Sequence, residues 1–396
     1  MGITIRVATD EDIDEIVLVD GRAFGQGFTT EQLADHRPTM DMQRFRLACD
    51  GSEIVGVAGS FDFDVTLPGG ASVPMGGVTW VSVSATHRRR GILRQLMDAI
   101  HADIDDRGEP VAMLGASEGG IYERFGYGVA SWMRAIEIDT NRTAMRPEFI
   151  PAPGSVRFVV GAESDAHVRR LWERYRRAQP GEFSRNDAWH RLIATVRSRA
   201  EGEISAAHTL AHRDGYASYR LEPRWNQGMP AHVLYLAEFV ALTPDAHAAL
   251  WSTLLSVDLV GTVRSDWAPV DDPLPYLLTN PRAVRTTNLS DQYWANVRDV
   301  ATCFSTRTYS TQDRMVIESD GRRWAIEGNP SGGVCHRVRS KPDLVVAHAQ
   351  LGSLLFGSTP ASRLAAGRRI TGTPAALRRA DAFFGCRPAA FSQTRY

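Results

Sequence analysis

The segment that most restricts the fold is a strand-like run that leads directly into an arginine turn and then into an amphipathic helix. Residues 76–85 (GGVTWVSVSA) read as a strand, and Arg-Arg-Arg-Gly follows at 88–91. Apolar residues then recur at helical spacing over 92–104, until a glycine and a proline end the pattern. A strand and a helix joined this closely are typical of a layered α/β unit.

The neighbouring segments complete that unit. Alternating or helical spacing predicts, in order, a strand, a helix, an antiparallel hairpin and a further strand at 3–8, 11–24, 46–50 with 53–63, and 111–117. The hairpin is indicated by an Asp-Gly-Ser turn between its two strand patterns. The sequence therefore predicts a mixed α/β domain over residues 1–146.

The pattern recurs beyond a proline-rich linker at 147–155. An alignment of Thr86 with Thr243 brings the apolar helix positions of the two segments into register, but Pro-Asp-Ala-His-Ala replaces the arginine turn. A helix that opens on Pro and Asp is well capped and poorly suited to an anion. We interpret residues 147–291 as a second domain of the same kind without the anion site. The alternative is that two α/β segments align this well by chance.

The remaining residues, 292–396, change character again. A hairpin is expected over 315–328 around an Asp-Gly turn, and two short helices are expected near 361–368 and 374–384. A chain of 396 residues is also too long for one ordinary core. We therefore predict three domains of the α/β (α+β) class, with a smaller α+β domain last.

Composition excludes several classes of protein. The net charge of −1 argues against a nucleic-acid partner, so the arginine turn is a local feature. No apolar run is long enough for a membrane span, and the N-terminus lacks the pattern of a signal peptide, so we expect a cytoplasmic protein. The 4 cysteines form no CxxC pair, and the HxxxH spacing of His208 and His212 lacks the following glutamate, so no metal site is predicted.

The arginine turn is best explained by an anionic ligand. The first N–H groups of a helix have no internal partner and attract anions, Gly91 permits close approach, and guanidinium groups bind phosphate oxygens. The other interpretation is a solvated helix start, which cations there would destabilise slightly. Neither GxxxxGK[ST] nor a GxGxxG that opens a helix after a strand is present. A diphosphate site of another kind is therefore predicted.

Arg88-x-x-Gly91 between a strand and a helix resembles the acyl-coenzyme A loop of the GCN5-related N-acetyltransferases (GNATs), although Leu93 departs from the Gly or Ala of that pattern. The longer motifs VSVSATHRRRGILRQLM and ASEGGIYERFGYG (116–128), the chain length and the aromatic C-terminal residue closely resemble the Eis (enhanced intracellular survival) acetyltransferases of actinobacteria. This resemblance implies tandem GNAT-like mixed sheets, the second without a coenzyme site, and a C-terminal sterol-carrier-protein-like domain. It also implies a homo-hexamer that acetylates amines, including those of aminoglycosides.

The resemblance carries a coenzyme site onto this sequence. Acetyl-CoA is the implied acetyl donor, its pantetheine arm paired with strand 81–83 and its thioester oxygen near the Val81 N–H. The implied coenzyme-binding residues are Val81, Ser82, Val83, Arg89, Arg90, Gly91, Ile92, Leu93, Arg94, Ser117 and Glu118.

Two residues match the family's acid and base. Tyr122 matches the general acid, because a phenol with a pKa near 10 is protonated at neutral pH and can donate to a departing thiolate. Tyr127 in the same motif is the competing candidate, for which we expect a structural role. The family's base is the C-terminal carboxylate, here that of Tyr396. Most chain ends are frayed, but an aromatic ending without a polar tail favours burial.

The acceptor amine is less well defined. The implied substrate-side residues are Phe24, Gln26, His36, Trp80 and Arg395, of which Phe24 and Trp80 are candidate aromatic walls for a cation. Since none is acidic, we expect weaker or narrower aminoglycoside acetylation than an acidic pocket would give. The acceptor can equally be another polyamine, or a lysine of a peptide. A different class remains open, in which the protein binds acyl-CoA or lipid as a scaffold without turnover.

Overall fold

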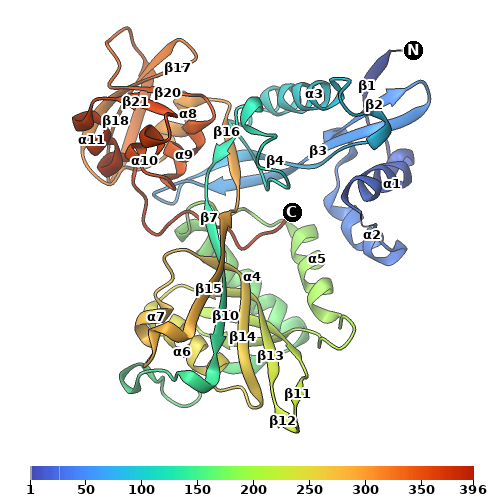
Figure 1. Cartoon of the computed structure of the whole chain (residues 1–396), viewed down its shortest axis with the longest axis vertical. Coiled ribbons are helices and arrows are strands. Elements are labelled where there is room, and N and C mark those ends of the chain that lie inside the picture. Colours follow the sequence, from blue (N-terminus) through green and yellow to red (C-terminus); the bar gives the residue numbers. More distant parts are fainter. Residues whose placement is uncertain (1, 26) are drawn as a thin grey trace.

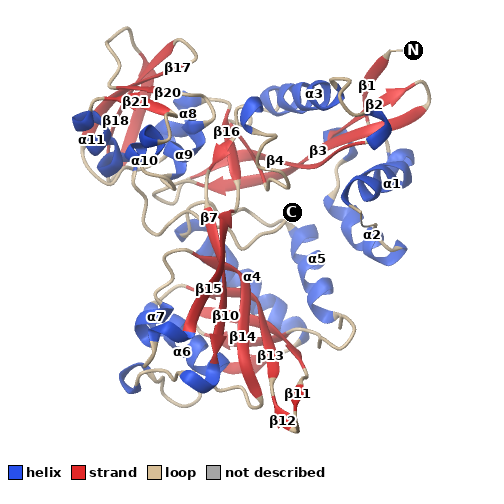
Figure 2. Cartoon of the chain, viewed as in Figure 1, coloured by secondary structure: helices blue, strands red, loops and turns tan. Residues whose placement is uncertain are grey.

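The computed structural model describes residues 2–25 and 27–396, which form three α/β units in chain order (Figures 1 and 2). The strands of the first sheet run in the order β1-β2-β3-β4-β5-β16-β6. Its own elements are β1 (Ile3–Val7), α1 (Ile13–Phe24), α2 (Thr30–His36), β2 (Phe45–Asp50), β3 (Glu53–Thr66), β4 (Ser72–Val83), α3 (Ile92–Asp106), β5 (Val111–Leu114) and β6 (Gly128–Val129). The strands and helices predicted around the arginine turn are therefore confirmed, including the antiparallel β2–β3 hairpin.

Helix α3 connects the parallel strands β4 and β5 and covers one face of the sheet. Its apolar positions form the stripe expected from the sequence, and Leu96, Ile100 and Ile104 are fully buried. Burial of this apolar surface makes the largest contribution to the stability of α3 on the sheet. The stripe fixes which face of α3 meets the sheet, and the short connection 84–91 keeps the N-terminus of α3 next to the end of β4.

Strands β4 and β5 separate part-way along their length. Their parallel pairing covers only Met75 to Gly77, opposite 111–113, and from there to Val83 strand β4 pairs with β3 alone. A bulge accompanies the separation, and Trp80 lies there with a φ of +53°, which is rare for a residue other than glycine. One edge of β4 thus keeps unpaired backbone groups at the end nearest α3.

The central unit repeats this plan. Its sheet has the order β15-β7-β14-β13-β10-β9-β8, and the parallel pairing of β13 with β14 covers only 232–235 on β13. Its elements are β7 (Trp132–Asp139), β8 (Arg157–Val159), α4 (Gly161–Ala178), α5 (Asp187–Ser198), β9 (His208–His212), β10 (Gly215–Glu222), β11 (Trp225–Asn226), β12 (Met229–Pro230), β13 (His232–Ala241), α6 (Pro244–Leu255), β14 (Val260–Pro269), α7 (Leu274–Leu277) and β15 (Val284–Asp291).

The first and central units exchange strands, which local sequence patterns do not predict. β7 precedes the linker at 147–155 but pairs with β14 and β15 in the central sheet. Conversely β16 (Trp294–Val297) pairs with β5 and β6 and completes the first sheet. The predicted domain boundaries at 146/147 and 291/292 therefore stay a prediction. Each of the two sheets contains one strand from the other side of one of these boundaries.

The third unit is built on a sheet of order β19-β18-β17-β20-β21. Its elements are α8 (Val300–Thr306), β17 (Asp313–Ser319), β18 (Arg322–Asn329), β19 (Gly332–Arg337), β20 (Leu344–Val346), α9 (Gln350–Phe356), α10 (Ala361–Ala366), β21 (Ile370–Gly372) and α11 (Pro374–Phe384). The fully buried Arg307 donates to the carbonyls of Leu354, Leu355 and Phe384 at the ends of α9 and α11. It satisfies carbonyls at the two helix ends, where the helices themselves supply few donors.

Beyond α11 the chain returns to the other two units as an extended tail, residues 385–396. Figure 1 shows this tail running from the third unit to a C-terminus that lies between the first sheet and α5. Ala390 to Thr394 are all buried. The expected burial of the chain end therefore holds up to Thr394, whereas Arg395 is exposed and Tyr396 is half-buried.

Candidate active site

The N-terminus of α3 has the geometry of an anion site. Gly91 is its N-cap, with a φ of +78° that favours glycine, and no side chain caps the first N–H groups. The first turn contains no acidic residue. The first N–H groups of such a helix point outward and carry partial positive charge.

The arginines of the turn surround this helix end. Arg88, Arg89 and Arg90 are exposed, and Arg90 contacts Asp50 at 3.2 Å. The Arg90 guanidinium holds the pKa of Asp50 below its usual value. Within residues 2–25 and 27–396, Arg88 and Arg89 have no hydrogen-bond or ion-pair partner, so two guanidinium groups are available to a ligand.

The matching helix of the central unit is closed to anions. The Thr243 hydroxyl accepts a hydrogen bond from the Ala246 N–H at 3.1 Å, Pro244 occupies the first turn, and Asp245 adds a negative charge. The capped helix start predicted for this copy is therefore confirmed. Of these two helix starts, that of α3 is the one suited to bind a diphosphate.

The predicted coenzyme positions lie around this helix end and the open edge of β4. Val81, Ser82 and Val83 are on β4 beyond its pairing with β5, and a short turn joins them to the α3 N-terminus. Ser117 and Glu118 follow β5, on the other side of the separation. The structure thus brings the predicted strand, turn and β5 residues to one end of the first sheet.

The two tyrosines of the GGIYERFGY motif have different surroundings. Tyr122 is 5% exposed, and burial raises the pKa of its phenol, an effect that the Ser117 hydroxyl partly opposes. Tyr127 is fully buried, and its hydroxyl is 2.9 Å from His101 Nε2. Since Tyr127 already has a hydrogen-bond partner inside the core, its surroundings match a structural role. Tyr122 lies beside Ser117, one of the predicted coenzyme residues.

The ring of Tyr396 reaches the point where β4 and β5 separate. Its hydroxyl donates to the Met113 carbonyl at 2.9 Å, and Met113 is the last β5 residue paired with β4. The ring stacks on Tyr293 with centroids 5.3 Å apart and packs on Phe63 at 5.2 Å. The chain end is therefore held at the same separation of strands as the predicted coenzyme positions on β4.

The predicted substrate residues are only partly brought together. His36 and Trp80 both contact the ring of Phe28, with centroid distances of 5.1 and 5.3 Å. Phe24 is 46% exposed, and the Arg395 guanidinium lies 4.6 Å from the ring of Trp267 instead. Gln26 lies outside the described residues. Burial lowers the pKa of His36, which favours its neutral imidazole.

Sequence reasoning missed Phe28 and one acidic residue, Asp20. Helix α1 packs against β3 and β4, and Asp20 is half-buried there beside Ser82. Burial raises the pKa of Asp20 to about 6. A signal for it exists, because Asp20 follows Ile13 and Ile16 at helical spacing and so interrupts the apolar stripe of α1.

Across residues 2–25 and 27–396, no cluster of three or more His, Cys, Asp or Glu side chains has a metal-binding arrangement. Within the same ranges, no helix combines the length and the apolar character needed to cross a bilayer.

The domain comparisons agree with this architecture. Residues 4–130 and 181–298 each match an acetyltransferase (GNAT) domain family, and residues 305–392 match a sterol carrier protein domain family. The predicted fold class, two GNAT-like sheets followed by a sterol-carrier-protein-like domain, is confirmed.

Similar proteins cover nearly the whole chain. The N-acetyltransferase Eis of Mycobacterium tuberculosis (strain H37Ra) is 33% identical, with 97% of each chain covered. An uncharacterized N-acetyltransferase of Streptomyces avermitilis is 36% identical over 85% of each chain. The crystal structure of Eis1 from Mycobacterium abscessus superposes with a TM-score of 0.87 at 31% identity and covers both chains completely.

Proposed function

Because the chain belongs to the Eis family of GNAT N-acetyltransferases, we propose that it transfers an acetyl group from acetyl-CoA to a primary amine at the open edge of β4. The observation that carries this proposal is the pairing of an uncapped α3 N-terminus with an open strand edge in the first unit. The corresponding helix start of the central unit is capped by its own threonine. The catalytic site is therefore assigned to the first unit.

The residues present fit the coenzyme. The N–H groups of 91–94 and the Arg89 and Arg90 side chains bind the diphosphate, while Ser117 and Glu118 flank the coenzyme at the end of β5. The backbone of 81–83 pairs with the amides of the pantetheine arm, and the Val81 N–H polarises the carbonyl. When bound, acetyl-CoA supplies an acetyl thioester, whose C–S bond breaks as the C–N bond to the acceptor forms.

Two groups of this chain move the protons. The carboxylate of Tyr396 attracts the acceptor ammonium and takes its proton, directly or through water, which leaves a nucleophilic amine. The phenol of Tyr122 gives its proton to the departing sulfur, and the remaining excess proton on the acetylated nitrogen leaves to the resulting phenolate or to water, which restores the acid. The raised pKa of Tyr122 keeps this phenol protonated throughout the neutral range, so the acid is loaded before each turnover.

The acceptor is proposed to be a primary amine of a small molecule or a peptide, such as an aminoglycoside, a polyamine or a lysine. An aromatic cluster is proposed to form one wall of the acceptor site, and it consists of Phe28 with the predicted substrate residues Trp80 and His36. Such a cluster can contact an amine and its apolar part. Asp20 adds one carboxylate. A single half-buried acid favours acceptors of low positive charge over polycations. Assembly as a homo-hexamer, as the family resemblance implies, is part of the same proposal.

The test is release of coenzyme A, followed with a thiol reagent, during incubation of acetyl-CoA with a panel of amines. Wild-type protein is expected to release thiol only when an amine is present. Tyr122→Phe is expected to lower kcat by about 10²-fold or more while its affinity for coenzyme A is unchanged. Binding of coenzyme A without turnover of any amine would instead favour the acyl-CoA or lipid scaffold.

A further inference from the structure

The C-terminal tail is bonded along its length to the central unit. The Phe391 N–H donates to the Pro180 carbonyl at 2.9 Å, and the Gln179 side chain donates to the Ala389 carbonyl at 2.8 Å. Both partners belong to the loop 179–186, which follows α4. The same loop pairs with the end of β3 through an isolated bridge between Val65 and Phe183. It is therefore fixed to the first sheet as well as to the tail.

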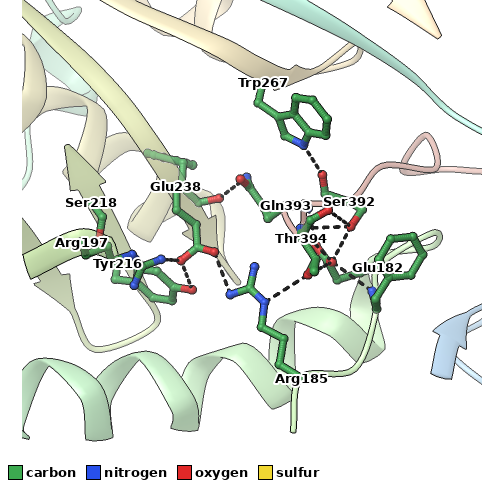
Figure 3. Close-up of polar contacts among 12 residues, drawn as sticks. Glu182, Arg185, Arg197, Tyr216, Ser218, Glu238, Trp267, Ser392, Gln393 and Thr394 are labelled. Atoms are coloured by element: carbon green, nitrogen blue, oxygen red, sulfur yellow. Dashed lines mark hydrogen bonds and ion pairs between the residues drawn. The ribbon is translucent and has the colours of Figure 1, made fainter. Parts of the chain in front are cut away.

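Glu182 is the centre of these contacts, and its side chain is fully buried (Figure 3). One carboxylate oxygen accepts from the hydroxyls of Ser392 at 2.7 Å and Thr394 at 3.0 Å. The other oxygen accepts from the Gln393 N–H at 2.7 Å. A buried carboxylate is costly unless its oxygens are bonded, and here tail donors bond both of them.

Arg185 holds the tail from the other side. Its Nε donates to the Thr394 hydroxyl at 3.0 Å, and its guanidinium is 2.8 Å from Glu238 on β13 (Figure 3). Glu238 in turn accepts from the Tyr216 hydroxyl at 2.7 Å and pairs with Arg197. Although burial opposes it, the two guanidinium groups hold the pKa of Glu238 at about 2. The Thr394 hydroxyl thus lies between the Glu182 carboxyl group and the Arg185 guanidinium, and both of these groups are held by further contacts.

This network occupies the separation of strands in the central unit. Beyond Tyr235 strand β13 is no longer paired with β14, as β4 is no longer paired with β5 beyond Gly77. The alignment of Thr86 with Thr243 places Glu238 opposite Val81. The Gln393 side chain donates to the Phe239 carbonyl in this stretch at 2.8 Å. The tail therefore contacts β13 at the position that corresponds to the proposed thioester site on β4.

We propose that the central unit uses its separated strands to dock the C-terminal tail, and that Glu182 and Arg185 are positioning residues for acetyl transfer. They act through Thr394, whose carbonyl also accepts from the Tyr293 hydroxyl at 2.7 Å. Two residues later the Tyr396 ring stacks on the same Tyr293. Fixing Thr394 therefore limits where the terminal carboxylate can lie. This inference rests on the proposed role of that carboxylate as the base.

The experiment uses the full chain with Glu182→Gln and Thr394→Val, and with Thr394→Ser as the conservative variant. Three quantities are measured: the rate at which a carboxypeptidase releases Tyr396, the affinity for coenzyme A by calorimetry, and kcat with KM for the best amine. Glu327→Gln is the matched control, since its ion pair with Arg314 is exposed on the third unit.

For Glu182→Gln and Thr394→Val we expect Tyr396 release to rise by about tenfold to a hundredfold, the range set by one charged, buried hydrogen bond. We expect kcat to fall by about tenfold or more at unchanged coenzyme affinity, because misplacing a reacting group by about 1 Å can cost as much as 10² in rate. Thr394→Ser and Glu327→Gln should behave as wild type.

Unchanged Tyr396 release in both variants would overturn the docking, and faster release at unchanged kcat would overturn the positioning role. Failure of the proposed function has a different signature. Wild-type kcat would survive complete removal of Tyr396 by the peptidase, whatever the variants show.

Discussion

The anion site at the start of α3 makes a graded prediction for its arginines. In Arg89→Gln the chain loses a guanidinium that has no protein partner in the described residues. The whole interaction of this guanidinium with the diphosphate of coenzyme A is therefore lost. A hydrogen bond from a charged group contributes about 1.5–3 kcal/mol, and the exposure of this site argues for the lower end. The dissociation constant for coenzyme A should therefore rise about tenfold.

Arg90→Gln should have a smaller effect. Arg90 already contacts Asp50 at 3.2 Å, so a ligand must compete with that carboxylate for the guanidinium. We expect about a threefold loss of affinity, or about 0.7 kcal/mol. The matched control is Arg107→Gln, since Arg107 lies at the far end of the same helix, bonded to Asp103. That end is about 22 Å away, beyond the Debye length of about 10 Å at 0.1 M ionic strength, so at this or higher ionic strength affinity should not change, and at lower salt any change should stay well below that of Arg89→Gln.

The assay is calorimetric titration of coenzyme A at low and high salt, and both active-site variants should approach wild type as salt rises. Two results would refute the reasoning. One is equal affinity of wild type and Arg89→Gln at low salt, and the other is an Arg107→Gln effect as large as that of Arg89→Gln.

Three further predictions test other parts of the structure. Adding Gly-Gly after Tyr396 moves the carboxylate beyond its site, so kcat should fall at least tenfold at unchanged coenzyme affinity; unchanged kcat would exclude the carboxylate as base. Asp20→Asn should raise the melting temperature more at pH 7.5 than at pH 4.5, because a carboxyl with a pKa raised to about 6 ionises at a cost as pH rises through that value; an equal shift at both pH values would mean that this pKa is not raised. Arg307→Met leaves the buried carbonyls of Leu355 in α9 and Phe384 in α11 without a donor, so thermal unfolding should show a loss of about 3 kcal/mol or more; a smaller loss would show that water replaces the guanidinium.

Local patterns predicted the parts of the fold whose cause is local. The stripe from Ile92 to Ile104 has only one way to be buried, so α3 and its flanking strands follow from spacing alone. The Thr243 cap likewise follows from a threonine, a proline and an acid at the right positions.

Long-range pairing and buried polar contacts were not predictable in the same way. β7 and β16 each join a sheet formed mainly by another part of the chain, and only packing decides which sheet that is. Glu182 sits in a polar loop between two helices, where an acid is usually solvated, and its tail partners are more than two hundred residues away. Phe28 lies just before α2 and contacts Trp80, which lies at a bulge of β4. The sequence does not reveal this bulge.

The central claim is that the start of α3 binds the diphosphate of acetyl-CoA so that its sulfur lies beside Tyr122 and the chain end. A crystal structure with bound coenzyme A tests it most directly. We predict the diphosphate on the N–H groups of 91–94, and the sulfur within about 4 Å of the Tyr122 hydroxyl, near hydrogen-bond reach. A diphosphate bound away from this helix start, or a sulfur far from both Tyr122 and the carboxylate of Tyr396, would contradict the account.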